Sequence, residues 1–271
     1  MSEAPEIPIV DGATRLYGII GDPIAQVGSP RLYTAHFRAV SRNAIMVPLH
    51  VLPDRFEATV RGLKALANLH GLVITVPYKA RIVPFVDRLR PMGEKVGAIN
   101  VMRRDSDGGW TGDMFDGYGL VRAVRAAGHA LEGRRVLLIG AGGVGSAIAV
   151  ALAEAGTGAI TVHDLEPTRA TALAERLARV VPGYHVTTGA PVAEDHNMIV
   201  NASPVGMAAG DGLPAPLGRV DPAALAVDVV VKSEPTAFLR HARSFGCPVV
   251  DGYAMMAAQI DAGIAFLDGR T

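Results

Sequence analysis

A run of glycines between a short apolar segment and a helix-forming segment is the feature that most constrains this chain. Residues 136–139 read Val-Leu-Leu-Ile, glycines stand at positions 140, 142 and 145, and residues 146–155 are rich in alanine. This order predicts a strand, a tight turn and the start of a helix, the arrangement that binds the pyrophosphate of a dinucleotide. Free N–H groups at the helix start then face the anion. A purely structural glycine turn is the alternative, because short glycine motifs are common.

The glycines have separate expected roles in this loop. Gly140 permits the tight turn, Gly142 lets the backbone approach the phosphates, and Gly145 lets the helix pack closely on the strand. An acidic residue, Asp164, ends the next predicted strand, where a carboxylate hydrogen-bonds free ribose hydroxyls. The expected cofactor-binding residues of this region are Gly140, Gly142, Gly143, Val144, Gly145 and Asp164.

Chain length and composition indicate two α/β domains. At 271 residues the chain exceeds the size at which a single core stops growing. Hydrophobic residues make up 49% and aromatic residues only 5%, which suits parallel α/β layers. The formal net charge is zero, with 26 basic and 26 acidic side chains and no basic block. We therefore expect neither a nucleic-acid partner nor an anionic membrane partner.

The cellular setting is predicted from the cysteine and the first residues. The single cysteine, Cys247, excludes an internal disulfide and fits a reducing compartment. Residues 1–8 are acidic and broken by proline, without the basic start and apolar run of a signal peptide. These features predict a cytoplasmic enzyme. No metal site is expected, because no histidine pairs with a cysteine or a carboxylate at ligand spacing.

Strand-like and helix-like segments alternate along the chain. The first part has predicted strands at 14–20, 45–51, 71–76 and 98–103, a hairpin at 105–110, and helices at 29–40, 54–67, 77–89 and 117–127. The second part has predicted strands at 136–139, 159–163, 184–187, 198–201 and 226–231, a loop at 206–222, and helices ending at 155 and spanning 167–180 and 252–267. In such sheets ligands bind beyond the carboxyl ends of the strands, so a cleft between the two domains is the expected site.

Further short motifs stand in a fixed order outside the glycine loop. They are Gly-x-Pro…Ser-Pro at 21–30, Val-x-Thr-x-Pro-x-Lys at 73–79, Gly-Ala-x-Asn at 97–100, Asp-Gly at 116–117, Asn-Ala-Ser-Pro-Val-Gly-Met at 201–207 and Asp-Gly-x-x-Met…Gln at 251–259. With Gly-Ala-Gly-Gly at 140–143, this series resembles the shikimate/quinate dehydrogenase family over nearly the whole chain. The resemblance implies an N-terminal α/β substrate domain (residues 1–120 and 249–271), a Rossmann domain (121–248) and a final helix that returns to the first domain.

The resemblance also implies roles for individual residues. Lys79 and Asp116 would form the catalytic pair, in which the lysine takes or relays the hydroxyl proton and the aspartate positions the ammonium group. Substrate contacts would come from Ser29, Thr75, Asn100 and Gln259, and further cofactor contacts from Asn201 and Gly252. Plainer roles remain open. Lys79 would be a solvated charge, Asp116 and Ser29 helix N-caps (Ser29 followed by Pro30), and Gln259 an exposed helix residue.

Several positions depart from the family pattern. Val27 and Gln26 replace a serine and a histidine, Val73 replaces an asparagine, Met114-Phe115 replaces Asn-Thr, and Val231 replaces a tyrosine. Losing such partners weakens binding of a polar acid by roughly 1–3 kcal/mol for each group left unpaired. The expected substrate is therefore shikimate, quinate or a related, less polar cyclic alcohol.

The cofactor and the function class are predicted with alternatives. NADP-using members of the family carry Asn-Arg-Thr where this chain has His163-Asp164-Leu165, so NAD is expected, with NADP as the alternative if Arg169 softens the repulsion of a phosphate. The expected function is an NAD(P)-dependent dehydrogenase acting on a ring hydroxyl. The alternatives are a paralogue for another cyclic polyol or an aminoshikimate-like compound, a non-catalytic nucleotide-binding regulator, and a methylenetetrahydrofolate dehydrogenase-like enzyme. A homodimer and a monomer both stay open.

Overall fold

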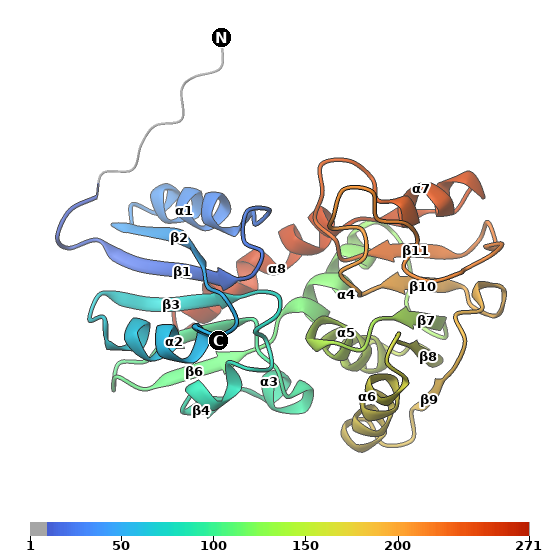
Figure 1. Ribbon diagram of the computed structural model, residues 1–271, viewed down its shortest axis with the longest axis horizontal. Coiled ribbons are helices and arrows are strands. Elements are labelled where there is room, and N and C mark those ends of the chain that lie inside the picture. Colours follow the sequence, from blue (N-terminus) through green and yellow to red (C-terminus); the bar gives the residue numbers. More distant parts are fainter. Residues whose placement is uncertain (1–9, 271) are drawn as a thin grey trace, which may run out of the picture. The chain divides into compact units, whose positions relative to one another are not determined.

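The computed structural model describes residues 10–270 and divides the chain into two compact units (Figure 1). Unit 1 comprises the chain up to Glu94, Ala98–Asp113 and the residues from Ile260 onward, and unit 2 comprises Lys95–Gly97 and Met114–Gln259. Residues 1–8, in which no targeting signal was expected, lie outside the described residues. Within residues 10–270 no helix is long and apolar enough to cross a membrane.

Unit 1 contains a six-stranded mixed sheet. Its strands, in spatial order, are β2 (Ala44–His50), β1 (Arg15–Gly21), β3 (Leu69–Ile74), β5 (Val101–Arg104), β6 (Trp110–Asp113) and β4 (Arg88–Leu89). β1 runs parallel to both β2 and β3, whereas β5 pairs antiparallel with β3 and with β6. The hairpin predicted at 105–110 is confirmed, since it connects β5 to β6. The parallel strands β1, β2 and β3 therefore present their carboxyl ends at one edge of the sheet.

Unit 1 also contains α1 (Ser29–Ala39), α2 (Phe56–Ala65), α3 (Pro91–Val96) up to Glu94, and the last part of α8 (Gly252–Leu267), from Ile260 onward. Each amphipathic helix forms because its apolar residues recur on one face. On α1 the buried residues are Tyr33 and Phe37, and the Phe37 ring lies 4.8 Å from the ring of Tyr17 on β1. On α2 the buried residues are Phe56 and Val60, with Phe56 stacked on Tyr78 at 4.2 Å.

The helix predicted at 77–89 is wrong. The structure has turns there, a short 3-10 helix at Val83–Phe85 and the edge strand β4. Pro84 lacks an N–H and disrupts a helix interior. The chain is instead drawn to the edge of the sheet, because Asp87 N donates to Trp110 O at 2.8 Å and Arg90 N donates to Gly112 O at 2.9 Å.

Unit 2 contains a six-stranded parallel sheet. Its spatial order is β12 (Val249–Val250), β11 (Leu225–Asp228), β10 (Met198–Asn201), β7 (Arg135–Ile139), β8 (Ala159–His163) and β9 (His185–Thr188). The chain runs outward from β7 through β8 to β9, then crosses back to β10 on the other side of β7. This order is the doubly wound Rossmann order, and its switch point lies between β7 and β10. The predicted α/β fold class with a Rossmann domain is confirmed.

The helices of unit 2 are α4 (Asp116–Ala126), α5 (Gly143–Glu154), α6 (Pro167–Val180), α7 (Ala237–Ser244) and α8 (Gly252–Leu267), with a 3-10 turn at Ala193–Asp195. The boundary between the two units lies within α8, after Gln259. α6 buries Ala170, Leu173 and Leu177 at helical spacing. α5 is apolar all round and is buried along almost its full length, as expected for the helix that follows the first Rossmann strand.

Besides the short segment Lys95–Gly97, the two units differ from the predicted domain limits in two segments. The predicted limits fell after residue 120 and before residue 249, but α4 and the first part of α8 belong to unit 2. Gly117 on α4 explains the first difference, since a Cβ there would overlap the backbone of Ala147 on α5. Gly252 explains the second, since a Cβ there would collide with the carbonyl group of Val230. Both helices are thus packed against unit 2 at distances that only glycine permits.

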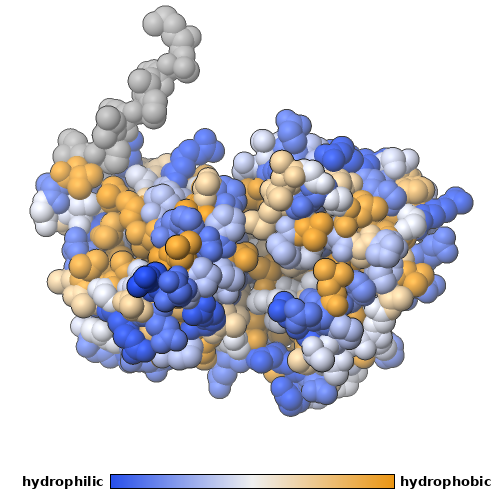
Figure 2. Space-filling model, viewed as in Figure 1, coloured by the Kyte–Doolittle hydropathy of each residue, from blue (hydrophilic) through white to orange (hydrophobic). Residues whose placement is uncertain are grey.

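Large apolar side chains that remain exposed are scattered rather than clustered. Leu52, Leu66 and Leu165 are examples, at 53%, 42% and 83% exposure. On the face shown in Figure 2, hydrophilic and hydrophobic residues are interspersed over each unit. Isolated apolar side chains of this kind are normal on a protein surface and mark no interface.

Candidate active site

The glycine loop of unit 2 lies at the switch point of its sheet, at the carboxyl end of β7. Gly140 has φ +104°, a conformation that side chains rarely adopt, and a Cβ there would lie 2.8 Å from the backbone of Ala202. A Cβ on Gly145 would overlap the carbonyl oxygen of Gly140. These two glycines therefore allow the turn and the close packing of α5 on β7. Gly142 differs, because a Cβ there would have nothing within 4 Å.

The start of α5 is suited to an anion. Gly142 is its N-cap, and no side chain caps the helix. The backbone N–H groups of Gly143, Val144 and Gly145 have no acceptor within residues 10–270, whereas Ser146 N donates to Gly142 O at 2.8 Å. Unpaired N–H groups and the positive end of the helix dipole attract phosphate oxygens. The open space at Gly142 leaves room for such oxygens beside the backbone, so the loop fits a dinucleotide pyrophosphate.

Asp164 closes the other side of this loop. It directly follows β8, and its Oδ2 accepts a hydrogen bond from Ala141 N at 2.7 Å while its Oδ1 accepts one from Glu166 N at 2.9 Å. The carboxylate is thereby fixed beside the glycine loop, where ribose hydroxyls are expected. Arg169 does not stand free to neutralise it, since its Nε pairs with Glu166 at 2.9 Å. The neighbouring Leu165 is 83% exposed and adds no positive charge.

The side chain of Asn201, an expected cofactor-binding residue, is engaged inside the protein. It is fully buried at the end of β10. Its Nδ2 donates to Val205 O and to Asp228 Oδ1, both at 3.0 Å, and its Oδ1 accepts from Ser203 N and Oγ at 3.1 and 2.7 Å. Every hydrogen-bonding position of the amide is filled by the protein. Asn201 therefore holds the loop that follows β10 beside Gly140.

The partner of Asn201, Asp228, was not among the predicted site residues. It is fully buried at the end of β11, and its carboxylate also accepts from Val230 N at 3.0 Å and from Thr236 Oγ1 at 2.5 Å. Burial raises the pKa of Asp228 even though these three hydrogen bonds lower it. The sequence did carry a signal, since Asp228 ends an apolar strand as Asp164 does. This network joins the ends of β10 and β11 to the start of α7.

Thr75, Lys79 and Asn100 are brought together in unit 1, at the carboxyl end of β3. Ile74 N donates to Asn100 O at 2.7 Å, and Ile99 N donates to Lys79 O at 2.8 Å. Lys79 and Thr75 are half-buried, and Asn100 is 5% exposed. Residues 99–100 are thus hydrogen-bonded to both ends of the segment 74–79, so three of the predicted substrate and catalytic residues belong to one local structure.

The first strand contributes to the same place. Thr75 N donates to Ile20 O at 3.0 Å, and Asp22 N donates to Val76 O at 2.9 Å. A Cβ on Gly21 would collide with the methyl group of Thr75, so the sequence needs glycine here. The hydroxyl of Thr75 makes no hydrogen bond within residues 10–270 and is available to a ligand.

Ser29 is the first residue of α1, and Gly28 is the N-cap of that helix without a side-chain cap bond. The alternative in which Ser29 caps the helix is therefore wrong, although the following proline lies in the first turn as expected. The half-buried Ser29 hydroxyl, like that of Thr75, has no hydrogen-bond partner within the described residues. It remains available for a substrate oxygen.

Asp116 and Gln259 belong to unit 2. Asp116 is 4% exposed and is the first residue of α4, while Phe115 is the N-cap residue without a cap bond. The N-cap alternative for Asp116 is therefore wrong. The N-terminal end of α4 stabilises a negative charge at this position. Gln259 is half-buried on α8, and a Cβ on Gly119 of α4 would lie 3.0 Å from its Cβ, so its stem packs on α4 rather than lying exposed.

The residues that depart from the family pattern pack as apolar side chains. Val73 lies inside β3 at 9% exposure and Met114 is 2% exposed. Val231 and Val27 are half-buried. Polar groups at these positions are therefore replaced by apolar surface, as the sequence predicts.

Comparison with known proteins identifies the same two parts. A model of the shikimate dehydrogenase substrate-binding domain matches residues 19–102, and a model of the shikimate/quinate 5-dehydrogenase family matches residues 122–202. A shikimate dehydrogenase (NADP+) of Rubrobacter xylanophilus is 38% identical over 93% of this chain and 90% of its own.

Two solved structures share the architecture. Shikimate 5-dehydrogenase of Listeria monocytogenes, solved with shikimate and NAD, is 27% identical with a TM-score of 0.83 and covers 96% of this chain and 93% of its own. Quinate dehydrogenase of Corynebacterium glutamicum, solved with NAD, is 28% identical with a TM-score of 0.84 and covers 94% of each chain.

Proposed function

Because this chain belongs to the shikimate/quinate dehydrogenase family, we propose that the residues described above bind shikimate, quinate or a related cyclic hydroxy acid and catalyse the reversible, NAD(P)-dependent oxidation of one of its ring hydroxyls. The chain is an NAD(P)-dependent oxidoreductase acting on a CH–OH group. When bound, NAD(P) would supply the hydride acceptor for the oxidation and the hydride donor for the reverse reaction. The protein binds the two molecules, orients them and moves the hydroxyl proton.

Lys79 is the proposed proton acceptor. A neutral amine takes the hydroxyl proton as the hydride leaves, and the resulting ammonium returns it during ketone reduction. Asp116, at the start of α4, is the proposed partner that orients this amine and accepts a hydrogen bond from a neighbouring substrate hydroxyl. Lys79 and Asp116 belong to different compact units, so the pairing is to be tested in solution.

Ser29, Thr75, Asn100 and Gln259 are the proposed substrate-binding residues. The hydroxyls of Ser29 and Thr75, free within the described residues, suit the carboxylate of the acid, to which both can donate. The amides of Asn100 and Gln259 donate and accept, as recognition of ring hydroxyls requires. The observation that carries this proposal is the hydrogen-bonded turn that groups Thr75, Lys79 and Asn100 at the carboxyl end of β3.

We propose NAD as the preferred cofactor. The pyrophosphate would be held by the loop 140–145 and the adenosine ribose by Asp164, with Gly252 at the start of α8 and Asn201 positioning the surrounding loops. The carboxylate of Asp164 repels a 2′-phosphate, and Arg169 is already paired with Glu166. The relatives named as NADP-dependent make this the most informative point to measure.

The test is a steady-state assay that monitors NADH and NADPH with shikimate, quinate and a panel of cyclic alcohols. Turnover of either acid, with a higher kcat/KM for NAD, supports the proposal. A higher kcat/KM for NADP refutes the cofactor preference. Turnover of a different polyol alone favours the paralogue. No turnover of any substrate, combined with tight NAD binding, favours a non-catalytic regulator.

Lys79→Met separates catalysis from cofactor binding. We expect kcat to fall by about 10²–10⁴-fold, the usual contribution of a general acid or base, while NAD binding is unchanged. Unchanged turnover would refute the assigned role of Lys79. A double-mutant cycle with Asp116→Asn then measures coupling between the proposed pair, and independent effects of the two substitutions would contradict the pairing.

Two further expectations concern the setting of the enzyme. A cytoplasmic location is proposed from the single buried Cys247, which fits a reducing compartment. The possibility of a homodimer comes from the apolar C-terminal helix, which could pack on its own domain or on a second subunit. Part of this helix packs within the chain, since Leu267 packs beside Gly71 and Tyr33 contacts Gly263. Sedimentation of the purified chain checks whether a dimer forms.

A further inference from the structure

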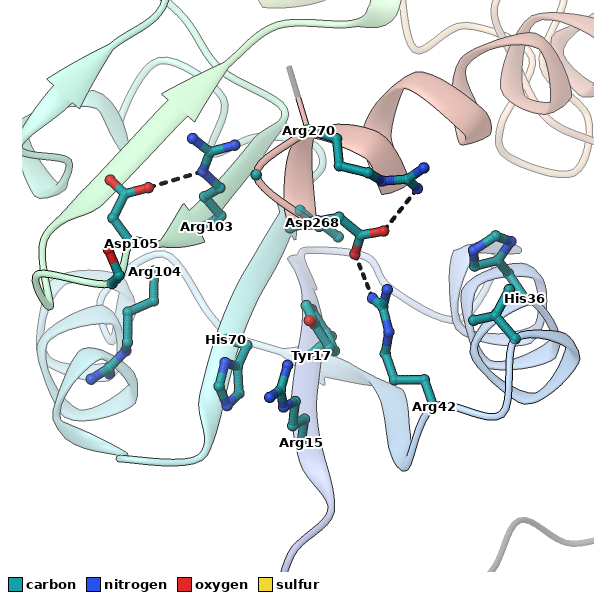
Figure 3. Close-up of a pocket in the computed structure, with 14 residues that line it drawn as sticks. Arg15, Tyr17, His36, Arg42, His70, Arg103, Arg104, Asp105, Asp268 and Arg270 are labelled. Atoms are coloured by element: carbon teal, nitrogen blue, oxygen red, sulfur yellow. Dashed lines mark hydrogen bonds and ion pairs between the residues drawn. The ribbon is translucent and has the colours of Figure 1, made fainter.

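A basic pocket in unit 1 is not used by the proposed reaction. Its volume is about 880 Å³, within the range of sites that hold small organic molecules. The lining residues come from β1, β3, α1 and the turn between α1 and β2, the β5–β6 hairpin, and the end of α8 with the residues that follow it. Figure 3 shows Arg15 and Tyr17 rising from β1 and His70 from β3, below Asp268 and Arg270.

Positive charge dominates the lining. Five guanidinium groups face two carboxylates, an excess of three positive charges when the histidines are neutral; the arginines are Arg15, Arg42, Arg103, Arg104 and Arg270. The carboxylate of Asp268 is shared by two of them, at 2.5 Å from Arg42 and 2.8 Å from Arg270. Arg15 and Arg104 have no carboxylate partner within residues 10–270. Their charges are therefore open to a ligand.

The guanidinium groups on the hairpin side are held in place. Arg104 donates to the carbonyl oxygens of Lys64 and Leu66 at 2.6 and 2.8 Å, and its Cζ lies 5.1 Å from the centre of the Trp110 ring. Arg103 donates to Phe266 O at 2.7 Å and to Asp105 at 2.9 Å. Fixed planar guanidinium groups bind carboxylates and phosphates well, because little side-chain freedom is lost on binding.

The positive charges around the pocket act on the titratable group His70. Burial lowers the pKa of His70, and the charges of Arg15 and Arg104 lower it further. The rings of His70 and Tyr17 lie 6.2 Å apart, and Val40, at 51% exposure, adds apolar surface to the lining. A ligand that carries a compact carbon skeleton as well as negative charge therefore finds contacts for both.

The pocket lies at the opposite edge of the sheet from the proposed substrate residues. Arg15 begins β1 and His70 is the second residue of β3, whereas Thr75 follows the end of β3. The five residue steps from His70 to Thr75 span about 17 Å. The pocket is thus separated from Thr75 and Lys79 by the length of the sheet.

We propose that this pocket is a second binding site, for a small organic polyanion with at least two phosphate or carboxylate groups. A polyanion matches the three excess charges, whereas a monoanion such as the expected substrate leaves most of them unbalanced. Its anionic groups bind Arg15 and Arg270 at the open side and Arg104 at the hairpin side. This inference does not depend on the identity of the enzyme's substrate.

The test is calorimetric titration of the full chain with citrate and, separately, inorganic pyrophosphate, at constant ionic strength. Saturating NAD is present so that the glycine loop is occupied. We expect saturable binding with one site per chain for at least one probe. The double variant Arg15→Gln/Arg270→Gln is expected to weaken it by roughly tenfold or more, since both lost groups are charged donors. Both side chains are exposed, so the fold should persist, as circular dichroism checks.

Two control variants locate the site. Arg219→Gln removes an exposed arginine in unit 2 and should leave binding unchanged. Lys79→Met alters the proposed catalytic residue at the other edge of the sheet and should also leave binding unchanged. The proposal is overturned if neither probe binds saturably, or if the double variant binds as well as the original chain. It is also overturned if Lys79→Met abolishes binding, because the anion would then occupy the substrate region.

Discussion

Replacing Asn201 by alanine tests the interpretation that this residue anchors the cofactor loop from inside the protein. The substitution removes four hydrogen bonds, two to Ser203, one to Val205 O and one to the carboxylate of Asp228. Ser203 is half-buried, so its N–H and hydroxyl can turn to water at little cost. Asp228 is fully buried and cannot, so its carboxylate loses one of its donors without replacement.

The expected loss follows from these contacts. An unsatisfied buried polar group costs about 1–3 kcal/mol, and the small cavity left by the amide adds to this. We therefore expect Asn201→Ala to lower the free energy of unfolding by about 2–4 kcal/mol. Asn43→Ala is the matched control, since Asn43 also makes side-chain hydrogen bonds, to Thr14 and Asp11, but lies exposed. Its expected cost is below about 1 kcal/mol.

The pH dependence of the Asn201→Ala effect adds a second, independent readout. Burial raises the pKa of Asp228 above its unfolded value, and the lost donor raises it further. An acid with a raised pKa in the folded state contributes stability below the unfolded pKa, and this contribution is lost as the pH rises through the folded pKa. The destabilisation should therefore be smaller in mildly acidic buffer than in mildly alkaline buffer.

Urea unfolding of both variants without cofactor, followed by circular dichroism in both buffers, provides the measurement. A loss for Asn201→Ala no larger than that for Asn43→Ala would refute the buried-anchor interpretation. A loss that grows towards acid pH would show that the carboxylate of Asp228 is not the group left without a partner.

Three further substitutions test the cofactor region and the chemistry. Gly145→Ala is expected to cost about 1–3 kcal/mol of stability, because its Cβ overlaps a carbonyl oxygen of the same loop, whereas the control Gly142→Ala has open space and should lower NAD affinity without changing stability; equal stability losses in urea unfolding would contradict this. Asp164→Ser should raise the NADP-to-NAD ratio of kcat/KM by roughly tenfold or more, since a carboxylate no longer repels the 2′-phosphate, and an unchanged ratio in the steady-state assay would place the discrimination elsewhere. Lys79→Met should lower kcat by about 10²–10⁴-fold without changing the NAD affinity measured by fluorescence titration, and a parallel loss of NAD affinity would indicate a structural role.

Local sequence patterns predicted the helices and strands whose apolar residues recur at a helical or strand period. The helix α6 and the strands β8 and β10 have the predicted bounds, because their apolar residues follow such a period and helix- or strand-breaking residues flank them. The helix α7 was not predicted, although Thr236 caps it by accepting a hydrogen bond from Leu239 N at 3.2 Å. Its eight residues are too few for a clear periodic signal, so the cap was the usable evidence.

Features that depend on contacts between residues distant in the sequence could not be predicted from local patterns. The segment 77–89 has helix-compatible residues, but backbone hydrogen bonds to β6 draw it to the edge of the sheet. Ser29 and Asp116 look like caps in sequence, yet each is the first helical residue after a different N-cap. The Asn201 side chain donates to Asp228, which is close to it in space but distant from it in the sequence.

The sequence by itself determined the two-part α/β architecture, the glycine loop and the order of the catalytic motifs, since each depends on residues close together in the chain. Tertiary structure alone decided which polar groups are satisfied inside the protein and which remain available to ligands. It placed the Asn201 amide among internal partners and left the hydroxyls of Ser29 and Thr75 without a hydrogen-bond partner in the described part of the chain, residues 10–270. It also gathered the five arginines of the basic pocket from four separate segments. Side-chain burial and long-range hydrogen bonds depend on how strands and helices pack, and no local pattern records that packing.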